Sequence, residues 1–349
     1  MDPFWVAVLV VVFALVFDVS NGWNDSANAI ATVVSTRVLR PGPAVLMGAS
    51  MNFLGALFSS EVAKTVGRDI ADPSLLVPAT FLAAVLIAPA WIALCTWKGL
   101  PISCSHSLMG GLIGAVLATT GPDGLKAAGV KKIVFGVFAS PLIGFTLGLL
   151  LIVLLYWLIF LLGRVTRVRP AGAGRAFGVL QLLSAAGMAF SHGTGDAQKA
   201  MGIISGALIS TGYLTLGADG HMPIPIWVRL ACAAAMAFGT AWGGWRVIRT
   251  LGMRLAHLRP LHGFAAETAA ATTILVNTLT GVPISTTHTI TGAIIGVGSA
   301  RGFRAVKWGV GGKIVFAWFV TFPVCIGGGY LLFEALAGLG SAGRLVPGQ

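Results

Sequence analysis

Two short polar segments interrupt hydrophobic stretches of the sequence at equivalent places. The first polar segment is Asn21-Gly22-Trp23-Asn24-Asp25-Ser26-Ala27-Asn28, and the second polar segment is His192-Gly193-Thr194-Gly195-Asp196-Ala197-Gln198-Lys199. When Gly22 is aligned with Gly193, Asp25 falls on Asp196. A carboxylate inside an apolar segment costs roughly 2.5–3.5 kcal/mol on insertion scales, so two at equivalent places indicate a functional site.

The composition is that of a polytopic membrane protein, with the lipid bilayer as a partner. Hydrophobic residues make up 56% of the 349 residues and charged residues 10%, whereas about a quarter of the residues in soluble proteins are charged. The apolar runs are continuous rather than alternating, which favours helices over a β-barrel. We therefore expect an all-α membrane protein.

The charges and cysteines disfavour two other classes of protein. The net charge of +12 comes from Lys and Arg between apolar segments, where the positive-inside rule expects them, so it predicts membrane topology and no nucleic-acid partner. The four cysteines have no CxxC spacing, which argues against a disulfide framework or a zinc site.

Several motifs recur in the same order and indicate an internal duplication. Pro101-Ile102-Ser103 recurs as Pro283-Ile284-Ser285, and Lys132-Ile133-Val134-Phe135 recurs as Lys313-Ile314-Val315-Phe316. We expect two homologous transmembrane repeats, residues 1–163 and 176–340, joined by a basic cytoplasmic linker at 164–175 and followed by a tail at 341–349. Each repeat should contain a discontinuous helix at its polar segment and a re-entrant half-helix hairpin. An odd number of crossings in each repeat would make the repeats inverted.

The two Pro-Ile-Ser motifs are candidates for an anion site. Proline suits the first turn of a helix, and the backbone N–H groups behind it are unpaired at the positive end of the helix dipole. The neighbouring side chains add donors without adding charge. The candidate residues are Ser103, Cys104, Ser105, His106, Ser285, Thr286, Thr287 and His288. The alternative is that the hydroxyls only cap the helices.

The aspartates of the polar segments suit a coupling cation. Each carboxylate repels an oxyanion until H⁺ or Na⁺ neutralises it, and Na⁺ at Asp25 and Asp196 would find amide oxygens nearby. The candidate residues are Asn21, Asn24, Asp25, Asn28, Asp196 and Gln198. The alternative is that the aspartates are N-caps of the resumed half-helices.

Three further residues are auxiliary candidates. Lys199 could touch the anion or extend to the membrane interface. Glu267 could act in the interior or lie at the interface, and Asn52 resembles it in placement. His106 and His288 could be structural histidines or proton carriers.

The chain resembles the inorganic phosphate transporter (PiT) family. The family signature Gly-x-Asn-Asp, followed by a small residue, Ala and Asn, is met by residues 22–28. The motif Pro-(Val/Ile)-Ser-x-(Ser/Thr)-His is met at 101–106 and at 283–288, and the family glutamate falls on Glu267. The second polar segment departs from the signature with Gly195 in place of Asn. Asn52, where eukaryotic relatives carry Glu, and the short linker suggest the prokaryotic branch.

This resemblance implies a symporter that imports inorganic phosphate across the bacterial or archaeal plasma membrane by alternating access, driven by H⁺ or Na⁺. It implies no enzyme activity and no cofactor. The oligomeric state stays open, and a homo-oligomer is one alternative. The alternatives are a permease for sulfate or another oxyanion and, from another class, an intramembrane hydrolase built on Ser103 and His106, which share a helix face. A channel is disfavoured because continuous conduction gives no reason for duplicated acids.

Overall fold

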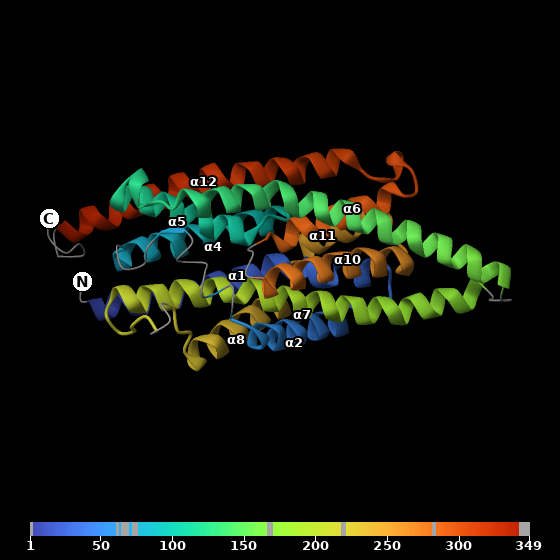
Figure 1. Ribbon diagram of the computed structural model, residues 1–349, viewed down its shortest axis with the longest axis horizontal. Helices are drawn as coiled ribbons and strands as arrows, with labels where there is room; N and C mark the ends of the chain where they lie inside the picture. The colour runs from blue at the N-terminus through green and yellow to red at the C-terminus, as the bar shows by residue number, and fades with distance from the viewer. Residues whose placement is uncertain are drawn as a thin grey trace.

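The computed structural model describes residues 3–60, 63, 70–71, 76–165, 170–217, 221–280 and 284–341, and it is a bundle of helices (Figure 1). The helices are α1 (Pro3–Ser35), α2 (Pro41–Phe58), α4 (Pro78–Lys98), α5 (Cys104–Thr120), α6 (Ala127–Val165), α7 (Pro170–Ser210), α8 (Ile226–Trp242), α9 (Trp245–Arg249), α10 (Pro260–Leu279), α11 (Thr286–Ser299) and α12 (Trp308–Ser341). The described residues contain no β-strand, only an isolated bridge between Ala256 and Val306. The predicted all-α class is confirmed.

Five of the described helices are long and apolar enough to cross a membrane: α1, α2, α4, α6 and α12. A sixth span results if α8 and the helix after it are counted together. The 39 residues of α6 make it about 58 Å long at ~1.5 Å per residue, well beyond the ~30 Å hydrocarbon core. Accordingly, α6 and α7 project beyond the other helices at one end of the bundle (Figure 1).

The predicted helix breaks at the two polar segments are absent. The first segment lies inside α1, which is continuous over 33 residues, and the second lies inside α7, which is continuous over 41 residues. The backbone need not unwind, because side chains from other helices pair with the polar residues. The described chain is broken instead between α8 and α9, where the helix axis bends by 60°. Gly243 takes φ +75° there, and a Cβ on Gly244 would lie 2.3 Å from the carbonyl oxygen of Trp23.

Two helical hairpins enter the bundle from opposite ends, α4 with α5 and α10 with α11 (Figure 1). The second helix of each hairpin is short, 17 residues in α5 and 14 in α11, or about 26 and 21 Å, and neither reaches across a ~30 Å core. The hairpin tips meet, because the rings of His106 and His288 are 4.8 Å apart. The predicted re-entrant half-helices are therefore α5 and α11.

The predicted linker is helical where it is described. Helix α6 continues to Val165 and α7 begins at Pro170. Residues 166–169 of the linker, Pro283 of the second motif and residues 342–349 of the tail lie outside the described residues. The boundaries of the two repeats stay a prediction.

Candidate functional site

The two aspartates of the polar segments meet in the interior around a histidine. Asp25 from α1 and Asp196 from α7 are both buried, as is His192. The Nε2 atom of His192 lies 3.3 Å from Oδ2 of Asp25 and 3.8 Å from Oδ2 of Asp196. One ligand atom from each of the three residues lies within 4.8 Å of the others. We call these three residues the carboxylate cluster.

A hydrogen-bond relay fixes the orientation of the His192 ring. Thr240 donates its hydroxyl hydrogen to the carbonyl of Met236 at 2.9 Å and accepts from Nδ2 of Asn52 at 2.8 Å. The amide oxygen of Asn52 is then the atom 2.9 Å from Nδ1 of His192, so Nδ1 donates. Since Nε2 faces Asp25, a hydrogen bond there requires a second proton, on the ring or on the carboxyl.

The tip of the second hairpin contacts the carboxylate cluster directly. The hydroxyl of Thr287 donates to Oδ1 of Asp25 at 3.0 Å, and the hydroxyl of Thr286 lies 3.4 Å from Oδ2. Nδ2 of Asn28 donates to the Thr287 hydroxyl at 3.0 Å. Residues predicted for a cation site and for an anion site therefore form one connected group.

Asp196 has a different set of partners from Asp25. Its Oδ1 atom lies 2.5 Å from Nζ of Lys199, and its Oδ2 accepts from Nδ2 of Asn21 at 3.5 Å. Lys199 is 1% exposed, so its ammonium does not extend to the membrane interface. Asp196 thus has a fixed cation, whereas Asp25 has hydroxyl groups and the His192 ring.

Two of the predicted cation ligands do not join the cluster. Asn24 donates to the hydroxyl of Thr96 at 2.7 Å and to the carbonyl of Leu100 at 3.3 Å, and so holds the first hairpin tip. Gln198 donates to the carbonyl of Thr194 and accepts from the backbone N–H of Ala63 at 3.0 Å. The structure gives Gln198 a role in helix packing rather than at the carboxylates.

No described helix begins at either aspartate, so the interpretation of Asp25 and Asp196 as N-caps is wrong. The expected place of proline is also wrong in the first motif. Helix α5 begins at Cys104, and the N-cap is Ser103, whose side chain accepts the N–H of His106 at 3.3 Å. Ser285 caps α11 in the same way, accepting from His288 at 3.2 Å. Serine satisfies a helix N-terminus through its hydroxyl, and Pro101 is left in the extended segment before the cap.

Unpaired polar atoms gather among the predicted site residues. Buried polar atoms are normally hydrogen-bonded, but six atoms of these residues have no partner in the described structure. They are Oδ1 of Asn21, Asn24 and Asn28, Oγ of Ser105, Nδ1 of His106 and Nε2 of His288. Amide oxygens are groups that bind cations and a hydroxyl can donate to an anion, but the two halves of the site stay a prediction.

Glu267 lies in the interior, apart from the carboxylate cluster. This buried residue of α10 accepts from the hydroxyls of Thr32 and Ser184 and from Nε2 of Gln181, the last at 3.4 Å. The three donors come from α1 and α7, so the carboxylate joins three helices. The interfacial alternative for Glu267 is excluded.

Sequence reasoning missed two residues of this region. The sequence alone assigns no role to His192 of the second polar segment, although this residue aligns with Asn21, a predicted cation ligand. Asp18 is fully buried on α1, beside the thiol of Cys232, about two helical turns before Asp25 and thus on the same helix face. That spacing could have identified it.

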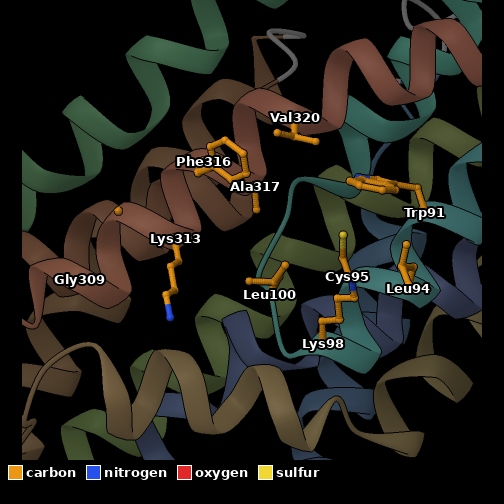
Figure 2. Close-up of a pocket in the computed structure, with 11 residues that line it drawn as sticks. Trp91, Leu94, Cys95, Lys98, Leu100, Gly309, Lys313, Phe316, Ala317 and Val320 are labelled. Carbon is orange, nitrogen blue, oxygen red and sulfur yellow. The ribbon is translucent and has the colours of Figure 1, made fainter.

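A pocket of about 570 Å³ lies between α4 and α12 beside the first hairpin tip (Figure 2). Its walls are mostly apolar, but Lys98 and Lys313 both line it. Leu100 also lines it, and its carbonyl accepts from Asn24. Two ammonium groups therefore stand close to the tip that carries the first anion motif.

Comparison with known proteins identifies the family. The profile of the phosphate transporter family matches residues 21–329. The chain belongs to the phosphate transporter family. A Rhizobium meliloti protein named probable low-affinity inorganic phosphate transporter is 47% identical over 312 residues, covering 89% of this chain and 90% of that protein. A Bacillus subtilis protein of the same name is 40% identical over 319 residues, covering 91% of this chain and 93% of that protein.

A solved structure named the sodium-dependent phosphate transporter has the same fold. It superposes with a TM-score of 0.85 at 25% identity, over 96% of this chain and 99% of that chain. The resemblance to phosphate transporters is thus confirmed. As a member of the phosphate transporter family, the protein is a multi-pass membrane protein and not an enzyme, which rules out the hydrolase built on Ser103 and His106.

Proposed function

We propose that this family member is a symporter that imports inorganic phosphate across the plasma membrane, coupled to H⁺ or Na⁺ by alternating access. The observation that carries the proposal is the 3.0 Å hydrogen bond between Thr287 and Asp25. This hydrogen bond joins a residue of the candidate anion site to a carboxylate of the candidate cation site. An ion at Asp25 therefore acts directly on the group that would hold phosphate.

The phosphate would be held between the two hairpin tips. The first turns of α5 and α11 offer backbone N–H groups at positive dipole ends. The side chains that follow the caps Ser103 and Ser285 add donors: Cys104, Ser105 and His106 in one hairpin, and Thr286, Thr287 and His288 in the other. The contact between the His106 and His288 rings supports one shared anion site rather than two separate ones.

The coupling ion would be held at the carboxylate cluster, with Asn21 and Asn28 beside it. Ionised Asp25 would repel phosphate from the adjacent tip, and a cation removes that repulsion. An inside-negative potential opposes anion entry by about 2.3 kcal/mol per charge per 100 mV, so accompanying cations are needed for uptake. The likeness to the solved sodium-dependent transporter supports Na⁺, and the proton required by the His192 relay supports H⁺.

The remaining polar residues would serve the movement between states. Asn52 orients His192, and Glu267 ties α10 to α1 and α7. The opposed hairpins support two inverted repeats, residues 1–163 and 176–340, that move against each other around the site.

Uptake of labelled phosphate into proteoliposomes tests this function. Sodium and pH gradients are imposed separately, and unlabelled arsenate and sulfate are added as competitors. We expect one of the two gradients to drive accumulation, and arsenate, which shares the geometry and charge of phosphate, to compete. Uptake that ignores both gradients would overturn the coupling. Competition by sulfate but not by arsenate would favour the sulfate permease.

A further inference from the structure

The ion pair between Lys199 and Asp196 is enclosed within the protein. Nζ of Lys199 lies 2.5 Å from Oδ1 of Asp196, and the two side chains are 2% and 1% exposed. They lie three residues apart on α7, so the same helix turn carries both charges. A buried charge is costly unless it is paired, and this pair is neutral without any added ion.

The first polar segment carries no such cation. In the alignment of the two segments, the position of Lys199 corresponds to Asn28, whose neutral amide donates to Thr287. Asp25, the counterpart of Asp196, has no Lys or Arg partner among the described residues. The two carboxylates are therefore equivalent in position but differ by one fixed positive charge.

Gly195 is a second difference between the two segments. It occupies the position of Asn24 and so removes an amide oxygen from the second segment. Packing does not demand glycine there, because a Cβ would meet only side-chain atoms, Oγ1 of Thr278 at 3.0 Å and Cγ2 of Ile274 at 3.8 Å. The second segment thus lacks the amide side chain that Asn24 supplies in the first segment, and it carries a permanent ammonium.

We propose that the Lys199 ammonium is a built-in counter-ion that takes the place of a mobile cation at Asp196. Asp25 alone is then left to bind a coupling ion at the carboxylate cluster. The transporter moves one cation fewer per phosphate than it would with two mobile sites. A mobile ion competes poorly at Asp196, because the tethered ammonium is present at high effective concentration. This inference rests on the proposed function.

Equilibrium phosphate accumulation in proteoliposomes, measured against imposed membrane potential, tests the inference. Lys199→Asn recreates the residue of the first segment and should admit a second cation. One extra positive charge per cycle multiplies the accumulation ratio at about 100 mV by roughly 50. The double variant Asp196→Asn with Lys199→Asn removes a neutral pair, so whatever uptake it retains should carry the wild-type number of charges per phosphate.

The exposed Lys131 supplies a matched control. Lys131→Asn removes the same charge outside the site and should leave the dependence on potential unchanged. The inference is overturned if folded Lys199→Asn keeps the wild-type dependence, or if the double variant loses one charge per cycle. If Lys199→Asn does not fold, the double variant and the charge-preserving Lys199→Arg decide, and the uptake of both should carry the wild-type number of charges per phosphate.

A second readout separates this inference from the proposed function. If the wild type accumulates no phosphate under any gradient, the proposed function fails. Equilibrium dialysis of purified protein with radioactive sodium then still counts the bound ions. One more sodium ion per chain in Lys199→Asn than in the wild type supports the built-in counter-ion, and equal numbers overturn it.

Discussion

The hydroxyl of Thr287 donates a 3.0 Å hydrogen bond to Oδ1 of Asp25, although the two residues lie 262 positions apart in the sequence. Asp25 belongs to a continuous helix and Thr287 to the first turn of a re-entrant helix. Through this contact, a change in the charge of Asp25 acts directly on a side chain of the proposed phosphate site.

Thr287→Ala should weaken the apparent affinity for the coupling cation. A hydrogen bond to a charged group contributes about 1.5–3 kcal/mol, so we expect the cation concentration for half-maximal phosphate uptake to rise roughly 10- to 150-fold. Thr287→Ser keeps the hydroxyl and serves as the control. If the two variants show the same dependence of uptake on cation concentration, the hydrogen bond between Thr287 and Asp25 has no part in coupling.

Asp25→Asn should abolish gradient-driven accumulation while leaving the protein folded. The amide preserves the shape of the side chain but cannot carry the charge that a coupling cation neutralises. Accumulation is measured in proteoliposomes, and folding is checked by size-exclusion chromatography. Full accumulation by this variant would show that Asp25 has no part in coupling.

Asp196→Asn should lose accumulation and also stability. It leaves the buried ammonium of Lys199 unpaired, and breaking a buried ion pair costs about 3–5 kcal/mol. The midpoint of thermal unfolding in detergent should fall, and the second substitution Lys199→Asn should restore most of it. A midpoint equal to that of the wild type would mean that the pair is not held in the folded protein.

Gly244→Ala should destabilise the protein at the break between α8 and α9. Its Cβ would lie 2.3 Å from the carbonyl oxygen of Trp23, and overpacking of this kind costs about 1–3 kcal/mol. Gly195→Ala is the control, because its Cβ meets only the Thr278 hydroxyl at 3.0 Å and an Ile274 methyl at 3.8 Å. The midpoint of thermal unfolding should be lower for Gly244→Ala than for Gly195→Ala. Equal midpoints would contradict the close approach at Gly244.

The sequence predicted the membrane class and the short helices after the Pro-Ile-Ser motifs, because the length of an apolar run is a local property. It failed at the polar segments, where it predicted broken helices. Whether a helix unwinds around Asn21 or Asp25 depends on partners that lie far away in the sequence, such as Asp196 and Thr287. Conversely, the break at Gly243 and Gly244 lies beside the Trp23 carbonyl oxygen, a neighbour that is distant in the sequence.

The membership of the candidate site was predictable only in part, and the pairing of its residues was not. The duplicated aspartates could be found from alignment alone. That His192 lies between them, that Lys199 pairs with Asp196 and that Gln198 turns away depend on the packing of α7 against its neighbours. No local pattern distinguishes Gln198 from Lys199 in this respect.

Phosphate binding to the purified protein, measured by calorimetry with sodium replaced by choline at several pH values, tests the central claim most directly. Coupling between two sites must appear as a change in affinity, typically about 5- to 150-fold. We expect phosphate to bind at least about tenfold more tightly when the coupling cation, Na⁺ or H⁺, is abundant. The same phosphate affinity at every sodium concentration and every pH would contradict cation-coupled transport through this site.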